Sequence, residues 1–235
     1  MENVILMASG LGTRMRPLTE SKPKPLIKVM GKPMIETIID GFQKRKVDNI
    51  YIVVGYLGEQ FDYLTEKYTN VKLIKNDYYQ TINNISSIYV AREYLKSGNC
   101  FICEADLYLS DYSILENDKL SSCYFGKFNM GFTDDWVFDL DDDKFITRVG
   151  KMGTDCYKMV GISYFKEKEA KILSDAIENA FGSEGYEDLF WDDVVNINLD
   201  KLKLTINPIM DNQIFEIDTV DELNEINDKV SKGVI

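Results

Sequence analysis

Residues 4–26 read VILMASGLGTRMRPLTESKPKPL, and the rest of the chain is best understood by starting from this stretch. An apolar segment of strand length, Val4–Ala8, leads directly to Gly10 and Gly12. A glycine turn at the carboxyl end of the first strand of a parallel sheet lets backbone N–H groups face a phosphate without interference from Cβ atoms. Between Gly10 and Lys32 the chain has six Lys or Arg residues and one Glu. The pattern therefore predicts an anion-binding loop after a first strand.

The composition limits the classes of protein to consider. The 235 residues carry a formal charge of −12, which argues against nucleic acid and anionic membranes as partners. No apolar run approaches the roughly 20 residues of a membrane span, and the N-terminus lacks the features of a signal peptide. We therefore expect a cytoplasmic protein without membrane insertion. Histidine is absent, so an enzyme with this sequence must work through carboxylates, Lys, Tyr, Cys or metal ions.

The first half of the chain alternates predicted strands with predicted helices. Apolar, β-branched runs of strand length lie at Val4–Ala8, Ile50–Val54, Val71–Ile74 and Phe101–Ala105. Apolar residues at helical spacing separate these runs at Met34–Lys46, Leu57–Tyr68 and Asn84–Leu95. This order predicts an α/β fold with a mostly parallel sheet flanked by helices, in a single domain over residues 1–235.

The pattern changes over residues 120–165. Shorter β-like pieces, separated by Asp- and Gly-rich turns, occur at Ser122–Phe128, Trp136–Leu140, Phe145–Val149 and Met159–Phe165. We interpret this part as a small antiparallel β insertion or lid. Beyond it the sequence predicts helices at Glu167–Phe181 and Leu189–Leu199, a strand at Leu202–Ile209, and a last helix that begins with a capping box at Thr219 and Glu222.

The glycine loop fits neither of the two common phosphate-binding motifs. A dinucleotide fingerprint requires a third glycine where Met15 stands, and the phosphate loop of NTPases requires Gly-Lys-Ser/Thr, which is missing. What remains is MASGLGTRMRPLT at residues 7–19, followed by Pro-Lys-Pro at residues 23–25. This pattern closely resembles the opening of the nucleotidyltransferases, or pyrophosphorylases, that activate sugar phosphates and alcohol phosphates with an NTP. The resemblance implies a Rossmann-like, GT-A-like nucleotidyltransferase fold.

The resemblance also assigns expected roles in the loop. The loop backbone and Arg14 would hold the β- and γ-phosphates, while Lys24 would neutralise the α-phosphate and the incoming phosphate. Fixed cations of this kind cancel the repulsion between two polyanions that must meet. The expected nucleotide-binding residues of the loop are Ala8, Gly10, Leu11, Gly12 and Thr13.

Nucleotidyl transfer requires a divalent metal on phosphate oxygens, and the expected cofactor is Mg²⁺. Asp106 follows the apolar run at Phe101–Ala105, and the corresponding Asp of the family binds Mg²⁺. The second ligand is either Asp192, in DLFWDDVV, or Asp218, in FEIDTVDEL. We favour Asp192, because Asp218 is partly explained as the cap of the last helix.

Over its whole length the chain most resembles the bacterial CTP:phosphocholine cytidylyltransferases, in stretches such as YYQTINNISSIYVAREYL, EADLYL, DLFWDDVV and FEIDTVDEL. This resemblance implies synthesis of CDP-choline from CTP and phosphocholine. Asn84 and Ser87 would lie near the base, although Asn84 could instead cap a helix. A trimethylammonium group must be bound by aromatic faces and a carboxylate, because it has no N–H to donate. The matching residues here are Trp136, Phe190, Phe215 and Glu216.

Two alternatives remain open from the sequence. The same chemistry could act on phosphoethanolamine, 2-aminoethylphosphonate or a sugar phosphate, and a primary ammonium would require hydrogen-bond acceptors rather than a ring of aromatics. The chain could also be a non-catalytic nucleotide-binding regulator, although intact Arg14, Lys24 and Asp106 argue against this class.

Overall fold

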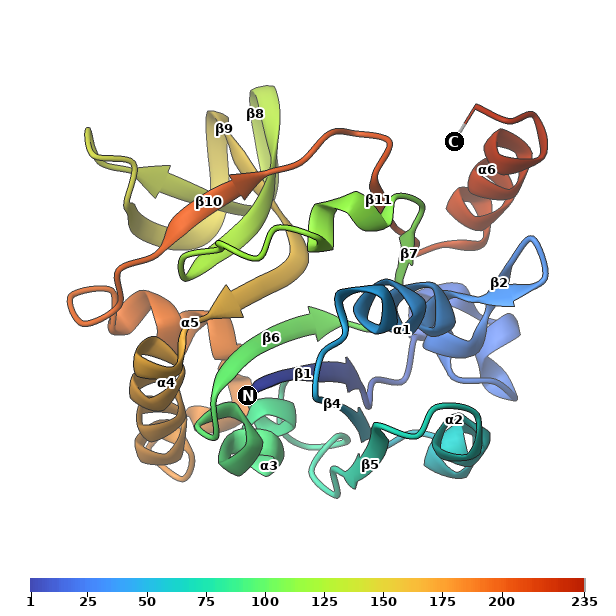
Figure 1. The fold of residues 1–235 in the computed structure, drawn as a ribbon, viewed down its shortest axis with the longest axis horizontal. Coiled ribbons are helices and arrows are strands. Elements are labelled where there is room, and N and C mark those ends of the chain that lie inside the picture. The colour runs from blue at the N-terminus through green and yellow to red at the C-terminus, as the bar shows by residue number, and fades with distance from the viewer. Residues whose placement is uncertain (235) are drawn as a thin grey trace.

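The computed structural model describes residues 1–234 and has a seven-stranded sheet at its centre (Figure 1). The strand order across the sheet is β10-β8-β9-β6-β1-β4-β5. Their bounds are β1 Glu2–Ala8, β4 Asn49–Val54, β5 Val71–Lys75, β6 Asn99–Glu104, β8 Cys123–Leu140, β9 Ile146–Phe165 and β10 Thr205–Pro208. Strands β6, β1, β4 and β5 are parallel neighbours, whereas β9 runs antiparallel to both β6 and β8. The sheet is therefore mixed and mostly parallel, as predicted.

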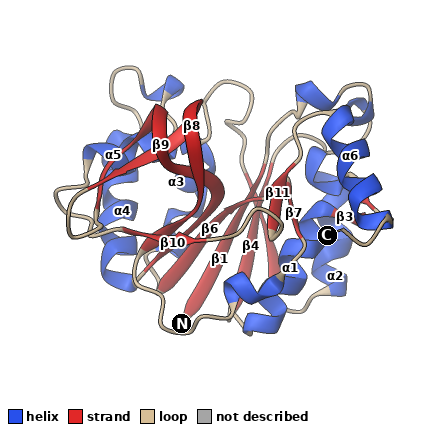
Figure 2. Cartoon of the chain, turned by 90° about the horizontal axis from the view of Figure 1, so that it is seen from above, coloured by secondary structure: helices blue, strands red, loops and turns tan. Residues whose placement is uncertain are grey.

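Helices cover both faces of the sheet. Their bounds are α1 Met34–Arg45, α2 Asp62–Lys67, α3 Ile85–Leu95, α4 Glu167–Ala180, α5 Trp191–Ile197 and α6 Val220–Ser231. Figure 2 shows α3, α4 and α5 on one side of the sheet and α1 and α2 on the other. Strand β1 is apolar on both faces for this reason: Val4 and Leu6 pack in the core with α1, while Ile5 packs in the core with α3. The predicted α/β class is confirmed.

The expectation for residues 120–165 was correct in its antiparallel character and wrong in its division into short pieces. The four pieces belong to two long strands, β8 and β9, which form a hairpin. Register shifts interrupt this hairpin, for example between Asn129 and Phe132, and each shift breaks the alternation that a sequence pattern depends on. The hairpin also joins the main sheet, because β9 pairs with β6 and β10 pairs with β8.

Two small antiparallel sheets complete the fold near the glycine loop. One pairs β2 Lys28–Val29 with β3 Lys32–Pro33, and the other pairs β7 Leu107–Leu109 with β11 Ile214–Glu216. Helix α6 follows β11, and its Leu223 and Ile226 pack in one cluster with Met15 of the glycine loop. The C-terminal helix therefore supports the loop after the first strand.

Several local predictions can be compared with the structure. The capping box of the last helix is confirmed: the Thr219 hydroxyl accepts from the Glu222 backbone N–H, and the Glu222 carboxylate accepts from the Thr219 N–H. The helix predicted at 57–68 is shorter, because residues 58–61 form a 3₁₀ turn before α2. The cysteines of β6, Cys100 and Cys103, are buried free thiols.

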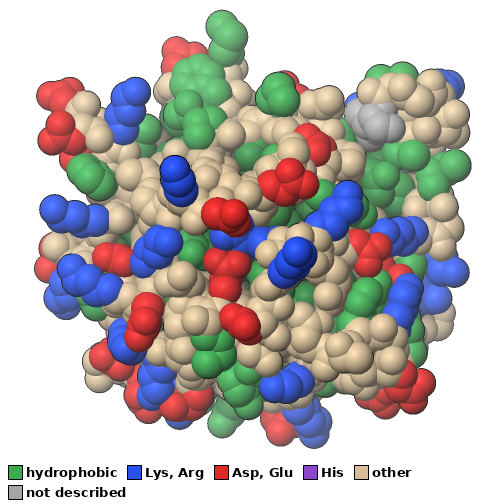
Figure 3. Space-filling view, viewed as in Figure 1, with side chains coloured by type: hydrophobic (Ala, Val, Ile, Leu, Met, Phe, Trp, Pro, Cys, Tyr) green, Lys and Arg blue, Asp and Glu red, His purple; other side chains and the backbone are tan. Residues whose placement is uncertain are grey.

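The surface in Figure 3 carries acidic and basic side chains intermixed over one face. Apolar side chains project at its upper edge, where the β8–β9 hairpin stands in Figure 1. The exposed apolar residues on these two strands are Phe128, Met130, Phe132 and Met152. Within residues 1–234 no helix is both long enough and apolar enough to cross a membrane.

Candidate active site

The glycine loop is shaped by close contact between Gly12 and Lys24. Gly12 has φ +61°, and a Cβ atom there would lie 2.8 Å from the Lys24 Cβ, so a side chain would be both strained and obstructed. The Thr19 hydroxyl donates to the Gly12 carbonyl at 2.8 Å and fixes the turn. Gly10 faces open space, because a Cβ there would meet no atom within 4 Å. The loop therefore lies directly against the aliphatic part of Lys24 and leaves its own backbone accessible at Gly10.

Lys24 is the centre of a charged cluster that joins distant parts of the chain. Its Nζ lies 2.6 Å from Asp106 Oδ2 and 2.6 Å from Asp218 Oδ1, and Arg14 Nη2 lies 2.7 Å from the same Asp218 oxygen. Burial lowers the pKa of Lys24, but the two carboxylates outweigh this effect and hold the pKa above its usual value. The lysine is therefore a fixed cation at neutral pH.

The small β7–β11 sheet is what brings the two aspartates together. Asp106 immediately precedes β7, and Asp218 follows β11 after one further residue. The antiparallel register pairs Glu216 with Leu107, so the start of one strand meets the end of the other. Two carboxylates 112 positions apart in the sequence thus share one lysine.

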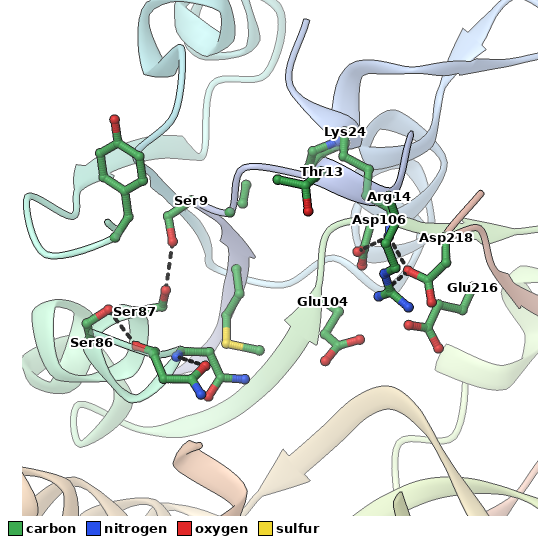
Figure 4. A pocket seen from close by; sticks show the side chains of 18 of the residues that line it. Ser9, Thr13, Arg14, Lys24, Ser86, Ser87, Glu104, Asp106, Glu216 and Asp218 are labelled. Atoms are coloured by element: carbon green, nitrogen blue, oxygen red, sulfur yellow. Dashed lines mark hydrogen bonds and ion pairs between the residues drawn. The ribbon is translucent and has the colours of Figure 1, made fainter. Parts of the chain in front are cut away.

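A cavity of about 410 Å³ extends from this cluster across the end of β1. Figure 4 shows Arg14, Lys24, Asp106 and Asp218 at one end of it and Ser9, Ser86 and Ser87 at the other. Of the residues expected to bind a nucleotide, those that line the cavity are Ala8, Gly10, Gly12, Thr13, Asn84 and Ser87. Leu11 does not line it, and its side chain is exposed to solvent.

The serine end of the cavity has a defined hydrogen-bond network. Ser9 Oγ and Ser87 Oγ lie 2.9 Å apart, and both residues are buried. Asn84 lies at the N-cap position of α3, but its side chain caps no helix N–H. Its Oδ1 accepts instead from the Trp191 N–H at 2.9 Å, and this bond ties α3 to α5. Asn84 therefore positions the wall of the cavity as well as lining it.

Two further carboxyl groups, Glu104 and Glu216, lie where this cavity meets a second one. Burial raises the pKa of Glu104 well above its usual value, and the negative charges of Asp106 and Glu216 add to the increase. Glu216 is exposed to solvent in the cavities. Its pKa is nevertheless raised to about 7, first because surrounding protein atoms reduce its solvation, and then because of the negative charges of Asp106 and Asp218. Both groups are unfavourable as anions until a cation neutralises them, so this junction favours a positively charged ligand.

The second cavity has a volume of about 310 Å³ and is lined mainly by polar groups of β8 and β9. Its charged and amide side chains are Glu104, Lys127, Asn129, Asp135, Lys158, Asp211 and Glu216. Asp135 forms an ion pair with Lys158. Lys127 Nζ donates to the Asp211 and Ile214 carbonyls at 3.0 and 2.6 Å, so it holds the segment before β11 against β8.

The three aromatic residues expected to form a cage do not surround one space. Trp136 lines the second cavity together with Phe128, whereas Phe190 and Phe215 do not line it. The Trp136 and Phe190 rings meet edge to face at 5.4 Å, and the ammonium of Lys151 lies 5.9 and 5.8 Å from their centres. Phe215 lies beneath the Lys127 ammonium, 5.2 Å from ring centre to Nζ. These rings already contact cations of the chain itself.

Asp192 lies apart from the Lys24 cluster. It is 3% exposed, and its Oδ1 accepts from the Tyr124 hydroxyl at 2.9 Å in the core beneath α5. Burial raises the pKa of Asp192 to about 7, against the opposing effect of the Tyr124 hydrogen bond. Its neighbour Asp193 accepts from the Phe190 N–H and caps α5. The structure thus brings Asp218, and not the favoured Asp192, beside Asp106.

Several residues of the site were missed by the sequence patterns. Ser9 and Glu104 both line the first cavity and lie within motifs that were recognised in the sequence. Ser9 follows Ala8, and Glu104 stands two residues before Asp106, so their place in these motifs was the signal that could have identified them. Lys127, Asp135 and Lys158 line the second cavity from the β8–β9 hairpin, whose register is interrupted by bulges. The sequence has no periodic signal for that arrangement.

Comparison with known proteins shows similarity to cytidylyltransferases over most of the chain. The family described as the MobA-like NTP transferase domain matches residues 4–117. A 2-aminoethylphosphonate cytidylyltransferase of Lancefieldella rimae is 53% identical over 221 residues, which are 94% of this chain and 90% of that protein. The choline-phosphate cytidylyltransferase of Streptococcus pneumoniae is 36% identical over 222 residues, 94% of this chain and 95% of that protein.

A solved structure gives the same result for the fold. The CTP:phosphocholine cytidylyltransferase from Streptococcus pneumoniae is similar with a TM-score of 0.90 and 34% identity, over 97% of this chain and 99% of that chain. The likeness therefore extends well beyond the glycine loop and includes the β8–β9 hairpin and the C-terminal helix.

Proposed function

The chain belongs to the cytidylyltransferase family of nucleotidyltransferase enzymes, and within that family we propose that its acceptor is 2-aminoethylphosphonate. The sequence alone favoured phosphocholine and kept this phosphonate as an alternative. The relative at 53% identity carries the name of the phosphonate enzyme, and the relative at 36% carries that of the phosphocholine enzyme. The proposed reaction joins CTP and 2-aminoethylphosphonate into a CMP conjugate and releases pyrophosphate.

The observation that carries the proposal is the chemistry of the second cavity. A trimethylammonium group is stabilised by several aromatic faces, whereas a primary ammonium requires hydrogen-bond acceptors for its three N–H groups. Four carboxyl groups line the cavity beside two lysines, Lys127 and Lys158, while Phe190 and Phe215 lie outside it. The junction at Glu104 and Glu216 adds a local preference for a cation. A primary amine fits this lining better than a choline head group.

CTP would occupy the first cavity with its base toward Ser9 and Ser87 and its phosphates toward the glycine loop. The loop backbone at Gly10, together with Arg14 and Lys24, would bind phosphate oxygens. In the described structure Arg14 and Lys24 contact carboxylates instead, so CTP would exchange some of these contacts for phosphate contacts. In this placement the phosphates would lie at the end that carries the charged groups, and the base at the end lined by uncharged serines.

The residues of the cluster fit a magnesium ion. Asp106 and Asp218 each present a hard oxygen ligand 2.6 Å from one cation, the Lys24 ammonium. Among residues 1–234 no group of three or more His, Cys, Asp or Glu side chains is arranged to hold a metal by itself. Two carboxylates plus substrate phosphates are the usual ligand set for Mg²⁺. When bound, the ion would offset negative charge on the phosphate oxygens.

The chain itself would act mainly by positioning and by charge. A phosphonate oxygen is ionised near neutral pH, so no general base is needed to create the nucleophile. Attack on the α-phosphorus forms the new P–O bond while the bond to pyrophosphate breaks on the opposite side. Lys24, fixed between two carboxylates, would stabilise charge where the two anions meet.

The test is pyrophosphate release with CTP and Mg²⁺ for a matched set of acceptors. 2-Aminoethylphosphonate and its N,N,N-trimethyl derivative differ only in the ammonium, and phosphoethanolamine and phosphocholine repeat the comparison with phosphate esters. We expect the primary amine to be preferred within both pairs and 2-aminoethylphosphonate to have the highest kcat/KM. Preference for phosphocholine would refute the proposed acceptor and leave the cytidylyltransferase assignment intact.

A pair of variants connects the preference to the second cavity. Asp135→Asn removes a carboxylate that lines it, and Asp134→Asn makes the same change one residue earlier, where the side chain does not line it. We expect the KM for 2-aminoethylphosphonate to rise several-fold in Asp135→Asn alone, with the KM for CTP unchanged in both. Equal effects of the two variants would argue against acceptor binding in this cavity.

A further inference from the structure

Asn76 lies behind the serine end of the first cavity and contacts every serine there. It follows β5 directly and is 1% exposed. Its Nδ2 lies 3.0 Å from Ser86 Oγ and 3.3 Å from both Ser9 Oγ and Ser87 Oγ. One amide group is thus surrounded by three buried hydroxyl groups.

The orientation of this amide is fixed by the backbone. The Tyr78 N–H donates to Asn76 Oδ1 at 3.0 Å, so the acceptor end of the side chain is occupied and turned away from the serines. The Asn76 backbone N–H donates to the Val54 carbonyl at 2.8 Å and holds the residue against β4. The serines therefore face the Nδ2 group, which has two hydrogens to donate and accepts none.

The serine hydroxyls must arrange themselves around this donor. Ser86 accepts from Asn76 and donates its own hydrogen to the Asn83 carbonyl at 2.8 Å. Ser9 and Ser87 also face Asn76, so neither can direct its hydrogen toward it. Their mutual contact at 2.9 Å uses one of the two hydroxyl hydrogens. The second hydrogen is left for a group in the cavity that both serines line.

We propose that Asn76 is a positioning residue for base selection, which fixes the serine hydroxyls so that they present a hydrogen-bond donor to the base of the nucleotide. The inference rests on the proposed placement of the base at this end of the cavity. The serine hydrogen would be directed to N3, which accepts a hydrogen bond in cytosine but carries a hydrogen in uracil, so that a donor would meet a donor; O2 accepts in both bases and does not distinguish them. A site that leaves such a pair unsatisfied discriminates against the wrong ligand. Asn76 thus favours CTP over UTP without touching either.

The experiment reverses the polarity of the network. Asn76→Asp is nearly isosteric and can still accept from the Tyr78 N–H, but its second oxygen only accepts. The serine hydrogens would then turn toward residue 76 and leave serine lone pairs facing the base. We expect the ratio of kcat/KM for CTP to that for UTP to fall about tenfold or more, the loss of roughly one hydrogen bond's discrimination. The ratio is insensitive to partial unfolding, because the folded fraction affects both nucleotides equally.

Two further variants control the result. Asn70→Asp makes the same substitution at the other end of β5, where the amide donates to the Val47 carbonyl, and it should leave the ratio at the wild-type value. Asn76→Ala removes the donor without adding a charge, and it should lower the ratio by a smaller factor, roughly threefold. This variant keeps the test available if Asn76→Asp fails to fold.

The outcomes separate this inference from the proposed acceptor. The ratio can be measured with whichever acceptor is turned over, so failure of 2-aminoethylphosphonate as acceptor leaves the test intact. An unchanged ratio in both Asn76 variants would overturn the positioning role. A wild-type enzyme that uses CTP and UTP equally would overturn it as well.

Discussion

The buried carboxyl of Asp192 has a calculable effect on stability that distinguishes a core residue from a metal ligand. Asp192 is 3% exposed, and burial raises its pKa from the usual 3.8 to about 7. Between these two pH values the unfolded chain loses a proton that the folded chain keeps. Folding stability therefore falls as the pH rises from about 4 to about 7 and is constant above that range.

The magnitude follows from the two pKa values. At about 1.36 kcal/mol for each pKa unit, the full cost of ionising Asp192 in the folded protein is about 4 kcal/mol. About 1.7 kcal/mol of this is already present at pH 5, so about 2.5 kcal/mol accumulates between pH 5 and pH 7.5. Asp192→Asn removes the titration and keeps an oxygen that can accept from Tyr124. The variant should gain about 2–3 kcal/mol relative to wild type over this pH interval.

The assay is urea unfolding of both proteins, without added metal, at pH 5, 6, 7 and 7.5. The difference between the two free energies of unfolding at each pH isolates residue 192, because all other titrating groups are shared. Mg²⁺ dependence of turnover, measured on the same preparations, should be unchanged by the substitution. A constant difference at all four pH values would refute the buried-carboxyl account, and a large rise in the Mg²⁺ requirement would restore Asp192 as a metal ligand.

Three other predictions concern the Lys24 cluster. Lys24→Ala should reduce turnover about 10³-fold but stability by only about 1–3 kcal/mol, because Asp106 and Asp218 remain partly solvated. The control Lys22→Ala, on the exposed part of the loop, should stay near wild type in both turnover and stability. Wild-type rates in Lys24→Ala would contradict the role of Lys24. Asp218→Asn should lower turnover about 100-fold and raise the Mg²⁺ concentration needed for half-maximal rate, and an unchanged metal titration would argue against a ligand there. Gly12→Ala should lower the free energy of unfolding by about 1–3 kcal/mol, because residue 12 has φ +61° and its new Cβ would lie too close to Lys24. Gly10→Ala should cost much less, since a Cβ there meets no atom within 4 Å. Equal losses in thermal or urea unfolding would contradict the packing argument.

The sequence predicted the elements whose signals are local. Strand β1 and the loop after it combine an apolar run with glycines whose spacing has a direct physical meaning, and both lie where expected. The capping box at Thr219 is local in the same way. The β8–β9 hairpin was read as fragments because its bulges interrupt the two-residue alternation, although its antiparallel nature was recognised.

The choice between Asp192 and Asp218 could not be made from local signals. In FWDDVV the sequence shows two adjacent carboxylates at the start of a helix, but only the packing of α5 decides which one enters the core. Asp193 caps that helix and Asp192 turns toward Tyr124. The position of Asp218 depends on the register of β11 against β7, a pairing between segments about a hundred residues apart. Long-range register leaves no trace in the spacing of residues along one segment.

The position of Asp218 depends on three local structures that meet at one point. Strand β11 sets its distance from Asp106, and the hydrophobic contacts of α6 with the glycine loop hold the segment that follows. Between them, Glu222 Oε2 accepts from both the Asp218 N–H, at 2.8 Å, and the Thr219 N–H, at 2.9 Å. The carboxylate that begins the last helix therefore also fixes the backbone of Asp218. A site positioned to within a few tenths of an ångström loses activity before the fold is lost. Damage to the start of α6 should consequently affect Asp218, one of the two carboxylates proposed to bind Mg²⁺, before it affects the stability of the central sheet.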